Sequence, residues 1–350
     1  MKAQKFKGRG AQSKVKNPFL NKEYVQDHWE GIDEELYSSP LTQVYYESPK
    51  KVINKVNSPD LALDYSINPY QGCEHGCAYC YARNTHNYWG FDAGLDFESK
   101  IIVKREIPIL FEKELLHKSW KPDPIMISGN TDCYQPLERK YKLTRQILTI
   151  ALKYRQPIGI ITKNSLIKRD LDILVQLAKL QLVQVFFSIN TLNEHLRNRL
   201  EPRTSSIQSK FDTMQLLSKN EIPVGVMVAP IIPGLNHHEI PDILKWASNN
   251  GALAAGYTVV RLNGSIGEIF KDWLSKFYPD RMLKVLNQIS ELHGGQLNDS
   301  NWNRRMKGEG PISSAISNLF KVSKEKHFQG KSIPPLNTSL FLKGGNYNLF

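Results

Sequence analysis

Three cysteines close together constrain this chain more than any other feature. Cys73, Cys77 and Cys80 form a Cys-x3-Cys-x2-Cys pattern, and the 350 residues contain only four cysteines. Thiolates usually ligate every iron of a [4Fe–4S] cluster, so three cysteines leave one iron free to coordinate a small molecule. Gly76 permits the tight backbone turn that wrapping a cluster requires. The pattern therefore predicts a loop that holds an iron–sulfur cluster.

A zinc site is the main alternative for the same cysteines. Structural zinc has four tetrahedral ligands, which usually come as two Cys or His pairs. The sequence contains no second pair, so His75 or the distant Cys133 would have to complete the set. A disulfide framework fits less well, because four cysteines in a long chain without a secretory signal do not indicate an oxidising compartment.

Composition limits the class of protein. The formal net charge of +12 can attract nucleic acid or anionic small molecules, so nucleic acid is a candidate partner. The basic residues are spread along the chain, however, and no single stripe marks a nucleic-acid interface. No run of 18 or more apolar residues is present, so we expect no membrane span. The first residues lack the apolar core of a signal peptide, and we expect a cytoplasmic protein.

Shifts in composition divide the chain into four parts. Residues 1–20 carry six Lys or Arg and no acid, which predicts a flexible basic arm. Residues 21–61 turn acidic and then mixed, and we expect an N-terminal extension there. The main domain is expected at residues 62–292, followed by a C-terminal extension at residues 293–350.

The main domain alternates short apolar runs with amphipathic stretches, which predicts βαβ units and a parallel sheet. The expected strands are Tyr65–Tyr70, Ile125–Gly129, Ile158–Thr162, Val183–Ile189, Val224–Ile232 and Tyr257–Leu262. The expected helices, with apolar residues three and four apart, are Leu143–Tyr154, Ser165–Leu180, Ser206–Asn220, His238–Asn249 and Met282–Leu292. The cysteine loop follows the first strand, at the carboxyl end where β/α barrels place their active sites.

The cysteine loop resembles that of the radical S-adenosylmethionine (SAM) superfamily. The Thr-Asp-x-Tyr-Gln-Pro-x-Glu pattern at residues 131–138 is similar to the spore photoproduct lyase-like branch of that superfamily. The resemblance implies an α/β fold, a partial (β/α)6 TIM-like barrel with N- and C-terminal extensions. It also implies a [4Fe–4S] cluster on the three cysteines and reductive cleavage of SAM to a 5′-deoxyadenosyl radical that abstracts hydrogen from a substrate. The electron would come from an external one-electron reductant of the flavodoxin or ferredoxin type.

The resemblance further implies which residues bind SAM. They are Tyr79, Asn130, Thr131, Asp132, Lys163, Ser188, Asn190 and Arg203. Tyr79 would lie near the adenine, Asp132 would accept the ammonium group, and Arg203 suits a carboxylate because its donors form a two-pronged fork. Two alternatives stay open: Asn130 and Asp132 stabilise a turn, and Arg203 forms a surface salt bridge with Glu201.

The substrate is not determined by these residues. In spore photoproduct lyase a cysteine outside the cluster returns a hydrogen atom to the product radical, and Cys133 is a candidate for that role; the alternative is a small, half-buried residue.

The reaction itself has three candidate classes. They are modification of a small molecule or protein side chain, repair or modification of nucleic acid by a photoproduct-type lyase, and a non-catalytic metal-binding interaction protein.

Overall fold

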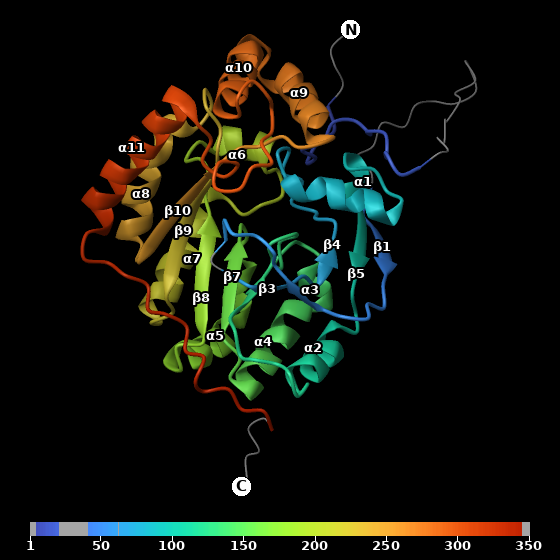
Figure 1. Cartoon of the computed structure of the whole chain (residues 1–350), viewed down its shortest axis with the longest axis vertical. Coiled ribbons are helices and arrows are strands. Elements are labelled where there is room, and N and C mark those ends of the chain that lie inside the picture. The colour runs from blue at the N-terminus through green and yellow to red at the C-terminus, as the bar shows by residue number, and fades with distance from the viewer. Residues whose placement is uncertain (1–4, 21–40, 62, 345–350) are drawn as a thin grey trace.

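The computed structural model describes residues 5–20, 41–61 and 63–344, and its centre is a seven-stranded sheet (Figure 1). Six parallel strands follow one another in chain order, and one antiparallel strand is added at the edge. The parallel strands are β3 (Tyr65–Ile67), β6 (Ile125–Ile127), β7 (Ile158–Thr162), β8 (Val183–Ser188), β9 (Val224–Ile231) and β10 (Ala254–Val259), and the edge strand is β2 (Ile53–Lys55). Because β10 and β2 form the two edges, the expected partial barrel is confirmed and its sheet is open.

Helices cover the outer side of this sheet, as Figure 1 shows. Those that follow the parallel strands pack on the sheet and on one another, and the last long helix packs against α8 and β10. The α-helices are α1 (Leu95–Ser99), α2 (Ile107–Leu115), α3 (Glu138–Tyr141), α4 (Leu143–Tyr154), α5 (Leu171–Lys179), α6 (Glu194–Leu200), α7 (Ile207–Lys219), α8 (Ile240–Asn249), α9 (Ile266–Phe277), α10 (Met282–Leu292) and α11 (Gly310–Phe328). Short 3-10 helices lie at η1 (Tyr81–Trp89), η2 (Ser165–Asp170), η3 (His237–Glu239) and η4 (Pro279–Arg281).

The first expected strand is split between two sheets. β3 ends at Ile67, and Tyr70–Gln71 forms β4 in a second, three-stranded sheet with β1 (Gln43–Tyr46) and β5 (Lys100–Val103). Pro69 lies at the break, and a proline has no N–H to continue a strand ladder. The small sheet holds the chain that leads into the cysteine loop.

The last strand of the barrel lies three residues earlier than expected. The expectation was Tyr257–Leu262, but β10 spans Ala254–Val259, and its register with β9 shifts between Tyr257 and Val259. The small residues Ala254, Ala255 and Gly256 carry no β-branched signal, so the sequence pattern did not mark them. By contrast, α4 and α10 have the expected bounds.

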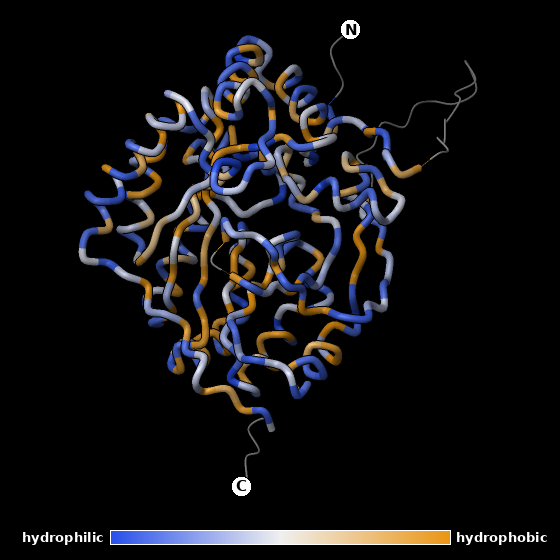
Figure 2. Tube along the Cα trace, in the orientation of Figure 1, coloured by the Kyte–Doolittle hydropathy of each residue, from blue (hydrophilic) through white to orange (hydrophobic). Residues whose placement is uncertain are grey.

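Apolar side chains of the strands form the main core. Ile127, Ile160, Val185, Phe187 and Val226 are each fully buried. Figure 2 shows hydrophobic residues along the central strands and hydrophilic residues at the outer turns. Burial at alternate positions of β8 matches the two-residue period of a strand.

The described part of the basic arm expected at residues 1–20 packs against the cysteine loop and α1. We call residues 5–20 the N-terminal strap; Figure 1 shows it beside α9 and α1. The N–H groups of Gly10 and Ala11 donate to the Glu98 carboxylate at 3.2 and 2.7 Å. Glu98 also forms a buried ion pair with Arg83. A Cβ atom at Gly10 would collide with the carbonyl oxygen of Gly76, so the strap fits against the cysteine loop only with glycine there.

The C-terminal segment crosses the opposite end of the barrel. The Gln184 amide donates to Pro334 O at 2.6 Å, and Leu342 N donates to Tyr154 O at 2.9 Å. Gln184 lies at the start of β8, so this segment covers the amino ends of the strands. Residues 1–4 of the expected arm and 21–40 of the expected extension lie outside the described residues. None of the described helices is long and apolar enough to cross a membrane.

We expect Glu98→Gln to destabilise the protein by about 3–5 kcal/mol, because it leaves the Arg83 guanidinium buried without its ion-pair partner. Urea unfolding measures this loss. The matched control is Asp172→Asn, which removes the partner of Arg145 at a site where the carboxylate is 60% exposed; we expect a loss below about 1 kcal/mol there. Equal losses in the two variants would contradict the anchoring role of Glu98.

Candidate functional site at the cysteine loop

The three cysteines lie in a buried loop at the carboxyl ends of the strands. Cys73 N donates to Phe97 O at 2.9 Å, and Ala78 N donates to Leu200 O at 3.0 Å, so α1 and α6 hold the loop from two sides. Gly76 has φ of +65°, a left-handed backbone that glycine adopts readily, at the tight turn expected there. Cys73 and Cys77 are 7% and 6% exposed. The loop is therefore a fixed, nearly water-free element.

The charges around these thiols fit a metal cluster. Burial raises the pKa of Cys77 well above its usual range, and neighbouring Glu201, Cys80 and Cys73 raise it further, whereas Lys163 lowers it. Three neighbouring thiols, of which Cys73 and Cys77 are buried, thus oppose one another's ionisation. Metal coordination removes this conflict because it deprotonates a thiol outright. Arg83 and Lys163 supply positive charge near the Cys80 thiol. The residues present fit the cluster that the sequence predicts.

The residues needed for a zinc site have other partners. The His75 ring lies 3.4 Å from the Asp132 carboxylate through Nδ1 and 3.1 Å from the Asn164 amide through Nε2. Cys133 is fully buried in the main apolar core of the barrel. The three loop cysteines belong to two other, smaller apolar clusters. Among the described residues no three Cys, His, Asp or Glu side chains converge on one metal ion. A cluster does not need such convergence, because each thiolate binds a different iron.

Four of the predicted SAM-binding residues come together beside the loop. The pairing of Thr162 with Phe187 places Lys163 next to Ser188, and Lys163 Nζ donates to Ser188 Oγ at 2.6 Å. Lys163 Nζ also lies 5.8 Å from the centre of the Tyr79 ring. The Asn190 amide donates to the Tyr79 hydroxyl at 3.5 Å. Neighbouring strand ends therefore present one polar surface to the cysteine loop.

Glu201 organises this surface, and the sequence analysis missed its role. The carboxylate is fully buried between Lys163 at 3.5 Å and Lys210 at 3.3 Å, and it accepts a hydrogen bond from the Tyr79 hydroxyl. Burial alone would raise the pKa of Glu201, but the two lysines lower it to about 2. The available signal was Lys210, which lies on the same face of α7 as Ile207, at three-residue spacing, within its buried stripe.

Arg203 does not join this surface. Its guanidinium is about one-third exposed and lies 3.4 Å from Glu74, and the backbone N–H of Arg203 donates to His75 O at 3.3 Å. The alternative of a surface salt bridge between Arg203 and Glu201 is wrong, because Glu201 is buried with the two lysines. The predicted contact of Arg203 with the SAM carboxylate stays a prediction. Arg203 instead lies on the outer side of the loop, near Gly8 of the N-terminal strap.

The residues after β6 hold the loop in place. Asp132 accepts hydrogen bonds from Thr162 Oγ1 at 2.8 Å, Lys163 N at 2.7 Å and Tyr134 N at 2.8 Å. The Gln135 amide accepts from Glu74 N at 3.0 Å and donates to Gly72 O at 3.1 Å, on both sides of Cys73. Asp132 and Gln135 thus fix the position of the cysteine loop through hydrogen bonds, a role that the sequence analysis did not predict.

The other two predicted residues of this segment also have partners. The Thr131 hydroxyl donates to Tyr70 O at 2.7 Å, and the Asn130 amide donates to Gln71 Oε1 at 3.0 Å. The predicted SAM contacts of Asn130, Thr131 and Asp132 stay predictions, as does the hydrogen-donor role of Cys133.

Two pairs of basic and aromatic side chains lie at the mouth of the barrel. Arg261, which follows β10, lies with its guanidinium carbon 5.7 Å from the centre of the Tyr81 ring. Arg305 lies 3.8 Å from the centre of a Trp302 ring. Tyr81 and Trp302 are each 48% exposed, and Tyr81 directly follows Cys80. We call these four residues the mouth patch.

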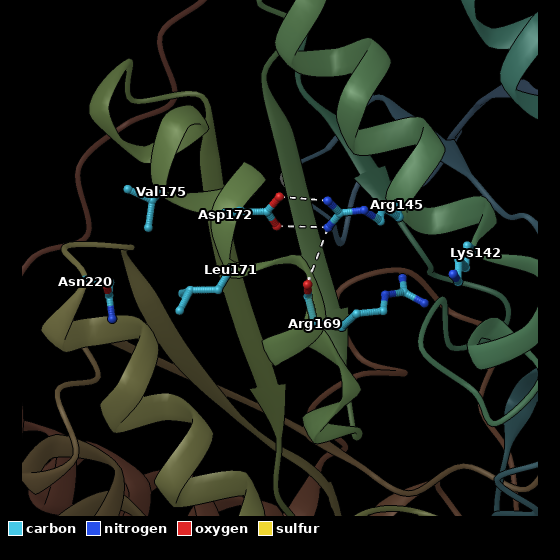
Figure 3. Close-up of a pocket in the computed structure, with 7 residues that line it drawn as sticks. All are labelled: Lys142, Arg145, Arg169, Leu171, Asp172, Val175 and Asn220. Atoms are coloured by element: carbon cyan, nitrogen blue, oxygen red, sulfur yellow. Dashed lines mark hydrogen bonds and ion pairs between the residues drawn. The ribbon is translucent and has the colours of Figure 1, made fainter.

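A separate pocket lies between α4 and α5, on the outer surface (Figure 3). It has a volume of about 690 Å³ and contains two arginines. Arg145 is paired with Asp172 at 2.7 Å, and Arg169 with Glu138 at 2.7 Å, so both positive charges are neutralised. No residue of the cysteine loop lines this pocket, which distinguishes it from the candidate site.

Comparison with known proteins adds sequence relatives. Residues 67–247, just over half of the chain, match the family model of the radical SAM superfamily. An uncharacterized protein of Mycobacterium tuberculosis is 31% identical over 66% of this chain and 69% of its own length. An uncharacterized protein of Methanocaldococcus jannaschii is 31% identical over 69% of this chain and 86% of its own. The radical SAM Nalpha-GlyT isomerase of Pseudomonas phage M6 is 24% identical over 55% of this chain and 38% of its own.

Solved structures show the same fold. Spore photoproduct lyase complexed with dinucleoside spore photoproduct matches with a TM-score of 0.60 and 15% identity, over 82% of this chain and 80% of that one. A mutant of that lyase with bound AdoMet and the same dinucleoside matches equally well, at a TM-score of 0.60. The family match, the cysteine loop and the open parallel sheet agree, and the chain belongs to the radical SAM superfamily.

Proposed function

We propose that this protein is a radical SAM enzyme with a [4Fe–4S] cluster on Cys73, Cys77 and Cys80. With the cluster and SAM bound, an added electron would cleave SAM to methionine and a 5′-deoxyadenosyl radical that abstracts hydrogen from a substrate. The observation that carries this proposal is the buried three-cysteine loop beside the polar surface of Tyr79 and Lys163. The zinc-binding and purely structural alternatives have no comparable support.

The residues around the loop have distinct tasks in this proposal. Lys163 stays charged, because Glu201 and Cys77 raise its pKa although burial opposes the charge. Its ammonium group would hold the carboxylate of SAM, and Ser188 and Asn190 would donate or accept hydrogen bonds from the neighbouring strand end. Glu201 fixes both the Tyr79 hydroxyl and the Lys163 ammonium, so it acts as a positioning residue. The low exposure of the loop excludes water from the reacting atoms.

We expect Cys77→Ala to abolish 5′-deoxyadenosine formation, because it removes one of the three thiolates that hold the cluster. The measurement is anaerobic reconstitution with iron and sulfide, followed by dithionite and SAM and chromatography of the products. Cys133→Ala is the control and should keep both iron and product, because Cys133 lies in the barrel core. A colourless wild-type protein that holds zinc and forms no product would overturn the proposal.

We expect Lys163→Met to weaken SAM binding by about tenfold or more, because a hydrogen bond to a charged group contributes about 1.5–3 kcal/mol. Equilibrium dialysis with the reconstituted protein measures the affinity, and iron analysis shows whether the cluster is intact. Lys168→Met, which removes an exposed lysine of η2, is the matched control and should bind SAM normally. Unchanged affinity for SAM in Lys163→Met would mean that Lys163 only forms the ion pair with Glu201 and does not bind SAM.

A nucleic-acid substrate is the second candidate, and the mouth patch favours it. Exposed aromatic rings beside arginines are typical of sites where bases stack on a basic surface. Tyr81 and Trp302 offer such rings within the mouth of the barrel, and the net charge of +12 favours a polyanion. The solved complex of spore photoproduct lyase, which shares the fold, contains a dinucleoside.

We expect Trp302→Ala to weaken binding of a fluorescein-labelled single-stranded DNA by about 1–3 kcal/mol, the usual contribution of one stacked base. Fluorescence anisotropy at about 50 mM and 200 mM salt gives the affinity and its salt dependence. Val322→Ala removes an exposed apolar side chain of α11 and should leave the affinity unchanged. If the wild-type protein binds no DNA or RNA at the lower salt concentration, the nucleic-acid candidate is wrong.

A further inference from the structure

The N-terminal strap carries a concentrated positive charge next to the cysteine loop. Residues 5–20 contain five Lys or Arg and no Asp or Glu. Lys5, Lys14 and Lys16 are exposed on it. This is the part of the chain whose role the proposed chemistry leaves unexplained, because none of its side chains reaches the polar surface around Lys163.

The strap holds these charges in a fixed position. The Asn17 amide donates to Asn87 O at 3.0 Å and to Phe91 O at 3.1 Å, at the end of η1. On the other side, Lys276 Nζ of α9 donates to Gln12 O at 3.2 Å. Lys5 Nζ lies 4.8 Å from the centre of the Phe277 ring. The strap is therefore an ordered surface and not a loose basic tail.

Neighbouring side chains add to the positive charge. A pocket of about 260 Å³ lies between the strap and α6, and Lys5 and Arg199 are among its lining residues. The acidic groups nearby have partners of their own. Glu98 is buried with Arg83, Glu74 lies 3.4 Å from Arg203, and Asp272 lies 2.9 Å from Lys276. Among the residues that the structure describes, the surface around the strap consequently keeps an excess of positive charge.

The strap and the SAM-binding side meet different parts of the cysteine loop. Tyr79 contacts Glu201 and Asn190, on the side of the strand ends. Gly76 lies against Gly10 of the strap so closely that a Cβ atom at Gly10 would collide with Gly76 O. A protein that docks on the strap would thus come close to the loop without obstructing the polar surface.

We propose that the N-terminal strap is the docking surface for an acidic one-electron donor protein of the flavodoxin or ferredoxin type. This inference rests on the proposed function, which requires one electron from outside. The donor loses one electron and the cluster gains one, and no bond forms or breaks between the two proteins. Complementary charge speeds such encounters and orients the partners.

The test reverses three strap charges in one variant, Lys5→Glu, Lys14→Glu and Lys16→Glu. We expect the rate of 5′-deoxyadenosine formation with limiting reduced flavodoxin to fall about tenfold or more, through a higher KM for the donor. With dithionite, which needs no docking, the rate should stay close to that of the wild type. Direct binding of oxidised flavodoxin, measured by isothermal titration calorimetry, should weaken in parallel and become less sensitive to salt.

The matched control reverses three exposed lysines of α11, Lys321→Glu, Lys324→Glu and Lys326→Glu, and should leave the KM for flavodoxin unchanged. An unchanged KM in the strap variant would overturn the proposal, as would an equal fall with dithionite and flavodoxin, which would mean a structural role. Failure of the proposed function is distinguishable, because the wild type would then form no product even with dithionite.

Discussion

The buried carboxylate of Glu98 is the interaction on which the cysteine loop depends. It accepts two backbone N–H groups of the strap and pairs with Arg83, which in turn donates to Cys77 O at 3.0 and 2.8 Å. A buried charge is tolerated only when its hydrogen-bonding capacity is filled, and here two separate segments, the strap and η1, fill it. The loop, the strap and α1 are therefore linked through one buried network of hydrogen bonds and an ion pair.

A second buried carboxylate, Glu201, arranges the other side of the loop. Two lysines surround it, so the group of three carries a net positive charge close to the Cys77 thiol. Lys163 lowers the pKa of Cys77 and so partly offsets Glu201 and the neighbouring thiols, which raise it. Its ammonium group also suits an anionic group of a bound molecule. One arrangement thus supports both the cysteines and the polar surface, because the same lysine faces both.

The open sheet gives the site separate approaches. The mouth patch lies beyond the end of β10 and next to Cys80, where a substrate would enter. The strap lies on Gly76, where we place the electron donor. The C-terminal segment covers the amino ends of the strands and leaves the carboxyl ends accessible. Under the two proposals, this separation of the surfaces would let substrate and donor bind at the same time.

The sequence by itself determined the cysteine loop, the parallel strands and most of the helices that follow them, because these depend on local spacing and on apolar periodicity. It also indicated that Lys163, Ser188 and Asn190 lie at strand ends. The register of β7 with β8 then places Lys163 beside Ser188. Only the tertiary structure decided the partners of the buried charges. Glu98 meets Arg83 and the strap, Glu201 meets Lys210, and Arg203 turns away to Glu74. Ion pairs between distant segments leave no periodic trace in a sequence, since their energy arises only when folding removes both partners from water.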